Sequence, residues 1–169
     1  PPVLNLDIAR LCSSRKKPLL MEKPLAVSSA EGREILKVMN ESGTPITVGQ
    51  TLRYNSVVGK LREALPGQGK LHTVYANQRI EPSNLPWLED PSAAGEGITF
   101  HIAVHVFDAL HFITGLRITR LFAQCRKCKT NSLEDLALVQ FEMEDGVFGI
   151  VDVSKLSGAR SGRFEFVCE

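Results

Sequence analysis

Three of the four histidines in this 169-residue chain fall on one predicted helix, residues 98–114. At about 100° per residue, His101, His105 and Asp108 share one side of that helix, and His111 lies beside them. The rest of the circumference is apolar, and a helix that is apolar nearly all round is buried. We therefore expect the polar side to face a cleft; hydrogen-bonded core histidines are the alternative. In a cleft, an imidazole can exchange a proton near neutral pH, because its ordinary pKa is about 6.5.

The spacing of these histidines also admits a metal site. His101 and His105 lie one turn apart, as the two histidines of zinc-binding helices do. Isoleucine follows His101 where such helices carry glutamate, and no third ligand beyond Asp108 is evident. The Cys-x-x-Cys motif at residues 125–128 lacks the two further ligands that a structural zinc needs. We predict no metal site and keep a metal-binding protein built on His101, His105 and Asp108 as an alternative.

Lys23 is the second candidate for chemistry, because it comes just after a predicted buried strand, residues 18–21. In open α/β sheets, ligands bind outside the carboxyl ends of the strands. A lysine there can donate to a substrate hydroxyl and lower the pKa of the alcohol; a solvated lysine is the alternative. Residues 81–97 form a predicted loop of a length that usually has a function, and Trp87 within it is a candidate for lining a pocket.

The elements that must position these residues begin with an alternation of helices and strands. The capping box Ser28-x-x-Glu31 marks one helix start, because the serine oxygen and the glutamate carboxylate satisfy free backbone donors there. Its apolar side carries Ile35, Leu36 and Met39. The predicted order is helix 6–13, strand 18–21, helix from 28 to near 43, and strand 45–49. This order is typical of parallel βαβ units.

From residue 51 onward the pattern changes to helices followed mainly by strands. Asp145-Gly146 between two of the strands is a strong hairpin signal, and strands joined by hairpins form an antiparallel sheet. The predicted elements are helices 55–65 and 98–114 and strands 71–80, 118–124, 136–143, 147–153 and 163–167. The sequence thus predicts the end of a parallel α/β unit followed by an α+β domain with an open sheet. Since there is no initiator methionine and the last strand runs to the final residue, we expect a truncated chain.

The composition excludes several classes of protein. Hydrophobic residues make up 43% of the chain and its formal net charge is +1, which argues against disorder and provides no basic excess for DNA or RNA. No uninterrupted apolar run reaches the roughly 18 residues that span a bilayer, and the N-terminus does not resemble a secretory signal. Four cysteines are too few for a disulfide scaffold, so we expect a cytoplasmic protein with no membrane partner.

Four short motifs follow one another along the chain: Met21-Glu22-Lys23-Pro24-Leu25-Ala26, Val48-Gly49-Gln50-Thr51-Leu52-Arg53-Tyr54-Asn55, Trp87–Pro91 with Ala94–Gly97, and His105-Val106-Phe107-Asp108 with Gly115 closing the helix. In this order and spacing they resemble the Gfo/Idh/MocA (glucose-fructose oxidoreductase/inositol dehydrogenase) family of NAD(P)-dependent sugar oxidoreductases. The resemblance covers nearly the whole chain and is clearest over residues 18–115.

The resemblance implies two domains and a cofactor, NAD or NADP. Residues 1–50 would be the C-terminal remnant of a Rossmann dinucleotide-binding domain. Residues 51–169 would be an α+β substrate and oligomerisation domain with an open, mainly antiparallel sheet, incomplete at its C-terminus. The glycine fingerprint that cradles the cofactor's pyrophosphate does not occur in this sequence. The family resemblance also implies a homo-oligomer formed through the C-terminal sheet.

By position, the resemblance makes Lys23 the active-site lysine and His105 the general acid/base, with His101 as a further catalytic candidate. Asp108 would also hold the helix or His105 in place. The implied cofactor-binding residues are Glu22, Lys23, Pro24 and Gln50, and the implied substrate-binding residues are Arg53, Trp87, His101 and Asp108.

The implied reaction is hydride transfer between the nicotinamide and a hydroxyl or carbonyl carbon of a sugar, cyclitol or related small alcohol. His105 would take the proton, and Lys23 would stabilise the developing alkoxide. Two departures from the family pattern stand out: His101 replaces a frequent aspartate, and Glu96 replaces a glycine. Because an imidazole cannot anchor a hydroxyl as a carboxylate does, a catalytically silent member that binds a ligand or partner is the alternative.

Overall fold

The computed structural model describes residues 1–130 and 132–169. Its N-terminal part confirms the predicted order of elements: α1 (Asn5–Ser14), β1 (Leu19–Met21), α2 (Ser29–Glu41) and β2 (Ile46–Val48). Strands β1 and β2 pair in parallel, with Leu19 opposite Ile46. A small core of Ala9, Ala26, Ile35 and Met39 joins the two helices to this pair of strands.

The capping box at the start of α2 is present. The hydroxyl oxygen of Ser28 accepts from the backbone N–H of Glu31 at 3.2 Å. The Glu31 carboxylate accepts from the N–H of Val27 at 2.8 Å, one residue earlier than the reciprocal bond of the standard motif. Of the three predicted apolar residues of α2, Ile35 and Met39 are fully buried, whereas Leu36 is 43% exposed and lies outside the core.

The second part of the fold is a five-stranded sheet in the order β4-β5-β6-β3-β7. The pairs β4–β5, β5–β6 and β3–β7 are antiparallel, and β3–β6 is parallel, so the prediction of a mainly antiparallel sheet is confirmed. The strands are β3 (Leu71–Arg79), β4 (Ile118–Arg126), β5 (Leu136–Met143), β6 (Phe148–Ser154) and β7 (Ser161–Cys168). The Asp145-Gly146 hairpin is also confirmed, with positive φ of 61° and 73° at these two residues.

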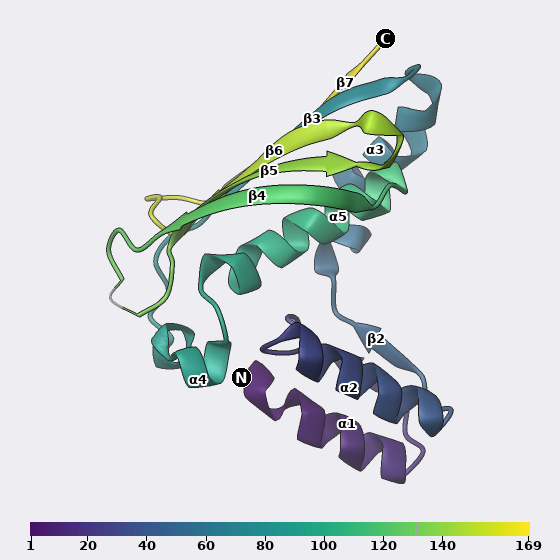
Figure 1. The fold of residues 1–169 in the computed structure, drawn as a ribbon, viewed down its shortest axis with the longest axis vertical. Helices are drawn as coiled ribbons and strands as arrows, with labels where there is room; N and C mark the ends of the chain where they lie inside the picture. Colours follow the sequence, from purple (N-terminus) through teal and green to yellow (C-terminus); the bar gives the residue numbers. More distant parts are fainter. Residues whose placement is uncertain (131) are drawn as a thin grey trace.

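Helix α5 (Val104–Thr114) crosses one face of the sheet, and the parts of the chain around α1 and α2 lie beyond its N-terminal end (Figure 1). It ends at Gly115, whose φ of 74° is the left-handed value that favours glycine. The main core forms between α5 and the inner face of the sheet, and its fully buried members include Val74, Val106, Leu110 and Val151. Helix α3 (Ser56–Ala64) packs beside α5.

One expectation about the middle of the chain needs correction. The predicted loop 81–97 contains two short helical turns, η4 (Pro86–Glu89) and α4 (Pro91–Ala94), the second of which is capped by the Asp90 carboxylate.

The helical segment Pro91–Thr114 is, by length and composition alone, long and apolar enough to cross a membrane. Its α5 part buries Val106 and Leu110 against the sheet, as expected of the central helix of a packed domain.

Candidate active site

Three segments meet near the junction of the two parts of the fold: the turn after β1, the turn after β2, and the start of the long helix. Lys23 comes from the first of these and is held by the third. Its Nζ donates to the backbone carbonyl of His101 at 2.7 Å. Burial lowers the pKa of the Lys23 ammonium, while the charge of neighbouring Glu22 partly offsets this effect. One N–H of the ammonium is thus committed to the protein, and two remain for a ligand.

The carbonyl that Lys23 contacts belongs to a wide, π-helical turn, η5 (Thr99–Ala103), that leads into α5. Such turns are rare and occur frequently at functional sites. Here the turn carries His101, and the first turn of α5 carries His105, so the predicted helix 98–114 is confirmed with a change of helical type at its start.

Glu134, which precedes β5, fixes this helix start. Its Oε2 accepts from the N–H of Gly97 at 2.9 Å, and its Oε1 accepts from the N–H of Thr99 at 3.1 Å. The backbone oxygen of Glu134 accepts from the N–H of Ile98 at 2.9 Å. A Cβ on residue 97 would collide with that backbone oxygen, which explains why glycine stands there. Glu134 could not be predicted from the sequence, since its partners lie more than 30 residues away and no local pattern marks it.

His105 is oriented by Gln50, from the turn after β2. The Nδ1 of His105 lies 3.1 Å from the amide oxygen Oε1 of Gln50. Because an amide oxygen only accepts, Nδ1 carries the proton, and Nε2 is left with a free lone pair. Burial is the main cause that lowers the pKa of His105, followed by the charge of Lys23, while Asp108 and Glu22 act in the opposite direction. His105 is therefore neutral near pH 7 and has the tautomer of a general base.

His101 is held still more firmly in the neutral form. Burial, followed by the charges of Lys23, Lys155, His105 and Arg160, lowers the pKa of His101 to about 4. Its Nδ1 is buried, and within the described residues it has no hydrogen-bond partner. A neutral imidazole with an unpaired buried nitrogen is unusual in a folded protein, because such groups are ordinarily satisfied.

Lys23, His101 and His105 line one cavity of about 790 Å³. This volume is within the range of small-molecule sites. Neutral and charged polar side chains complete the wall, among them Thr51, Gln78, Glu81, Ser83, Arg160 and Ser161. The backbone of Glu81 itself and the guanidinium of Arg160 lower the pKa of the Glu81 carboxyl, which is therefore ionised. The arrangement suits a ligand rich in hydroxyl groups beside one ammonium and two neutral imidazoles.

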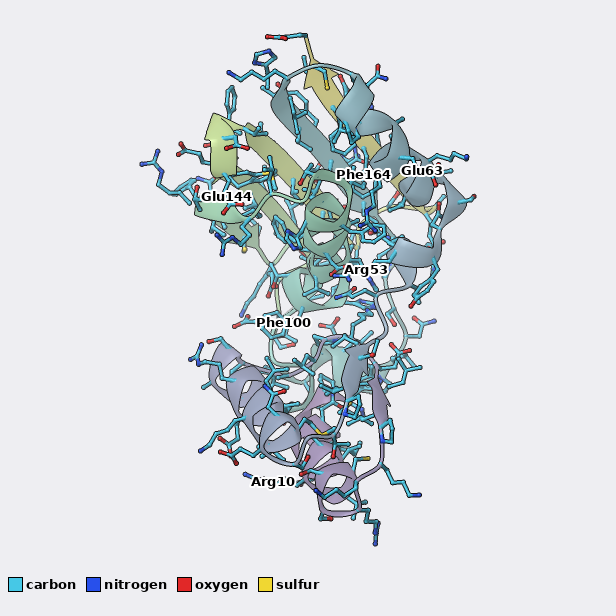
Figure 2. All side chains as sticks on the ribbon, turned by 90° about the vertical axis from the view of Figure 1, so that its right-hand side faces the viewer. Arg10, Arg53, Glu63, Phe100, Glu144 and Phe164 are labelled. Atoms are coloured by element: carbon cyan, nitrogen blue, oxygen red, sulfur yellow. The ribbon has the colours of Figure 1, made fainter. Side chains whose placement is uncertain are left out.

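Arg53 and Asp108 lie apart from this cavity, although both are predicted substrate-binding residues. Arg53 Nε and Nη2 donate to the two carboxylate oxygens of Asp108 at 2.8 and 2.6 Å. The pair lines a neighbouring cavity of about 530 Å³ together with Pro24, Thr47 and Gln50. Figure 2 shows Arg53 at the level where the sheet part of the fold meets the part below it. Asp108 was also expected to hold the helix or His105 in place, and its hydrogen bonds go to Arg53, so it ties α5 to the turn after β2 and makes none to His105.

The other predicted residues surround Lys23. The carboxylate of Glu22 accepts from the backbone N–H of Lys23 at 3.2 Å. Trp87 is half-buried and lines a cavity of about 20 Å³ with Lys23, Pro24 and His101, a space with room for about one water molecule. Trp87 therefore packs behind the lysine and does not line the large cavity.

The metal alternative gains no support from the geometry. Within residues 1–130 and 132–169, no three side chains of the His, Cys, Asp or Glu type gather as a metal site requires. Cys125 and Cys128 are exposed free thiols. His111 is exposed and its Nδ1 lies 3.0 Å from the backbone oxygen of Leu116, so it takes no part in the cluster of His101 and His105.

Comparison with known proteins gives consistent results. Myo-inositol 2-dehydrogenase of Thermotoga maritima is 24% identical over 156 residues, which cover 88% of this chain and 46% of that protein. A solved oxidoreductase domain protein from Kribbella flavida has a TM-score of 0.92 at 23% identity and covers 100% of this chain and 51% of its own. GenD2 from gentamicin A biosynthesis, solved in complex with NAD, has a TM-score of 0.90 at 23% identity, with 99% and 50% covered.

The chain spans about half the length of the curated relatives that it matches. A family model described as the GFO/IDH/MocA C-terminal domain matches residues 68–169, which include β3, α5 and the remaining strands of the sheet. Since this match covers more than half of the residues, the chain belongs to the GFO/IDH/MocA family.

Proposed function

We propose that the chain forms the substrate side of an NAD(P)-dependent oxidoreductase that acts on a sugar, cyclitol or related small alcohol. One observation carries the proposal: Lys23 and His105 line the same cavity, and each is fixed by one protein hydrogen bond that leaves two N–H donors on Lys23 and the Nε2 nitrogen of His105 for a ligand. The inositol dehydrogenase among the relatives, and the relative solved with NAD, support this substrate class and this cofactor.

The residues present fit the nicotinamide end of such a cofactor. Parallel strands β1 and β2 end at the same edge, where ligands of open α/β sheets bind. Glu22, Lys23, Pro24 and Gln50 lie at that edge and would hold the nicotinamide and its ribose, since they offer an ammonium, an amide and a carboxylate. No glycine fingerprint for the pyrophosphate occurs in these 169 residues. When bound, the nicotinamide would supply the acceptor or donor of the hydride.

The protein's own residues would then handle the proton and the charge on oxygen. In the oxidation direction, the nicotinamide would take the hydride of the carbinol carbon, and Nε2 of His105 would take the proton of the hydroxyl. The O–H electron pair becomes the second bond of the carbonyl. The Lys23 ammonium donates to the oxygen while negative charge develops on it. Gln50 keeps Nδ1 of His105 protonated, so that Nε2 is the basic nitrogen throughout.

A catalytically silent family member is the second candidate, and His101 is the observation that favours it. A neutral imidazole at this position cannot accept a short, charge-assisted hydrogen bond from a substrate hydroxyl. On this alternative, the protein binds NADH or NADPH together with a sugar-like ligand and does not turn them over.

We also propose the boundaries and the setting of the protein. Residues 1–50 would close a Rossmann domain, and residues 51–169 would form the substrate and oligomerisation domain. The two separate hydrophobic cores on either side of this boundary support the division. Four free cysteines support a reducing, cytoplasmic setting.

The outer face of the sheet supports a homo-oligomer. Phe122, Phe148, Ile150 and Tyr75 are exposed there by between 38% and 62% of their surface. They line a hollow of about 650 Å³ on the side opposite α5. Apolar patches of this kind mark interaction surfaces. A symmetric dimer in which the outer sheet faces of two copies pack against each other would cover this patch.

The experiment is a search for hydride transfer. It uses a fusion in which the dinucleotide-binding part of the Thermotoga maritima relative precedes Pro1. Reduction of NAD⁺ or NADP⁺ that depends on a sugar, polyol or sugar acid supports the oxidoreductase. Binding of NADH without turnover of any of these substrates favours the catalytically silent member. If neither NADH nor NADPH binds, both the oxidoreductase proposal and the silent-member alternative are refuted.

A further inference from the structure

The large cavity carries more positive than negative charge on its wall. Lys23 and Arg160 contribute two cationic side chains, and His101 and His105 are neutral. Arg79 also lines the cavity, but its guanidinium is paired with Asp152. Among the described residues of the wall, Glu81 is the one carboxylate. A ligand that brings a negative charge of its own would therefore improve the electrostatic balance of the site.

Arg160, whose side chain lines the cavity and is 81% exposed, is the cationic group that would receive that charge. It precedes β7 and donates from Nε to the Oε2 of Glu81 at 3.1 Å. In the part of the chain that the structure describes, this is its one side-chain hydrogen bond, so both Nη nitrogens are available. The contact with Glu81 engages Nε of the guanidinium and leaves the N–H groups of Nη1 and Nη2 unbonded to the described residues. Two parallel N–H donors at that end match a carboxylate or phosphate.

The surroundings of His101 support the same conclusion. Apart from burial, the groups that lower its pKa are Lys23, Lys155, His105 and Arg160, and of these Lys155 is paired with the Glu89 carboxylate at 2.7 Å. The positive charges of Lys23 and Arg160, which line the same cavity, thus act at the position of the imidazole, whereas Glu89 balances the charge of Lys155. A carboxylate at position 101 would cancel this field and repel an anionic ligand, whereas a neutral histidine does neither.

We propose that the substrate is a polyhydroxy compound bearing an anionic group, a carboxylate or a phosphate, with the anion on the Arg160 guanidinium and the reacting carbinol between Lys23 and His105. The uncharged donors Gln78, Ser83 and Ser161 of the same wall contact its hydroxyl groups. This inference rests on the proposed function, because it names the substrate class of the same site.

The test compares matched sugars that differ in one charge. Calorimetric titration of the chain with D-glucuronate, D-glucose 6-phosphate and D-glucose separates a carboxylate, a phosphate and a neutral ligand. We expect the better of the two anions to bind at least about ten-fold more tightly than glucose, as charge-assisted hydrogen bonds do relative to neutral ones, and this advantage to shrink at high salt. Arg160→Gln should reduce it to roughly two-fold, and Arg160→Lys should retain part of it.

Arg117→Gln is the matched control, because Arg117 is equally exposed, pairs with Glu144, and lies outside the cavity. Equal binding of all three sugars, no binding of any, or an equal loss of glucose and anion in Arg160→Gln would each overturn the inference. The proposed function is tested separately, by hydride transfer in the fusion. If the fusion oxidises neutral polyols and shows no preference for sugar acids or sugar phosphates, the anion site is refuted and the oxidoreductase proposal is supported.

Discussion

The two imidazoles of the cavity occupy neighbouring turns, yet their surroundings differ. His105 is held through Nδ1 by Gln50 and has one free nitrogen, whereas the Nδ1 of His101 is buried without a partner in the described residues. Helical spacing predicts that these histidines share a side of the helix. It cannot predict the partner of each ring, because Gln50 lies 55 residues from His105 and comes from a different element.

The titration of His101 should be visible in the stability of the fold. In the unfolded chain its ring takes up a proton near the ordinary value of 6.5, whereas the folded protein keeps it neutral down to about pH 4. As the pH falls between these values, the unfolded state binds more protons, so the fold loses stability. We expect a loss of roughly 1 to 2 kcal/mol from this group, allowing for the partial exposure of the ring.

The measurement is the free energy of unfolding in urea at pH 7 and pH 5, for the wild type and His101→Gln. The variant should show a smaller loss on acidification. His72→Gln serves as the control, since His72 is exposed and lies outside the cavity. An unchanged pH dependence in His101→Gln would show that the ring is not held neutral by its site.

At the scale of elements, most helices and strands could be predicted, because their short-range sequence signals agree with the structure that they adopt in the fold. The capping box at Ser28, the Asp145-Gly146 turn and the apolar helix that ends at Gly115 were each found from short-range signals. The π-helical turn and its attachment to Glu134 were not, because they depend on contacts between segments far apart in the sequence. The short helices inside residues 81–97 were hidden by the prolines of that segment, two of which, Pro86 and Pro91, lie in first turns, where proline is tolerated.

Gly97→Ala tests the attachment between the helix start and Glu134. A methyl group there would overlap the backbone oxygen of Glu134, and such overpacking typically costs about 1 to 3 kcal/mol of stability. Gly59→Ala in α3 is the matched control, because nothing lies near its added Cβ and alanine is the better helix former by roughly 1 kcal/mol. Urea unfolding should show Gly97→Ala below the wild type and Gly59→Ala at or above it. Equal stabilities of the two variants would contradict the close approach.

At the scale of the whole molecule, α5 covers one face of the sheet (Figure 1). The other face exposes the apolar patch of Tyr75, Phe122, Phe148 and Ile150. We expect sedimentation to show an oligomer that Phe122→Glu dissociates, because a buried charge would oppose the packing of two such faces. Val57→Glu, at a similarly exposed apolar position on α3, should leave the oligomer intact. A wild-type monomer at high concentration would remove the proposed interface.

The cavity itself depends on this whole arrangement, since Lys23 comes from the parallel strands and the histidines from the helix under the sheet. Sequence motifs predicted Lys23 and both histidines as a site. They did not predict that Arg53 and Asp108 would pair with each other in a neighbouring cavity, because that pairing follows from where η2 (Thr51–Tyr54) meets α5.

The central claim is that Lys23 and His105 perform hydride-transfer chemistry in one cavity. Its most direct test is kcat/KM for NAD(P)-dependent oxidation of a polyol or sugar acid by the fusion carrying Lys23→Ala, His105→Ala or His111→Ala. We expect His105→Ala to lose roughly 10² to 10⁴-fold, Lys23→Ala to lose on the order of 10²-fold, and His111→Ala, on the exposed side of the same helix, to stay within about two-fold of the unmodified fusion. Retained activity in His105→Ala and Lys23→Ala would contradict the account.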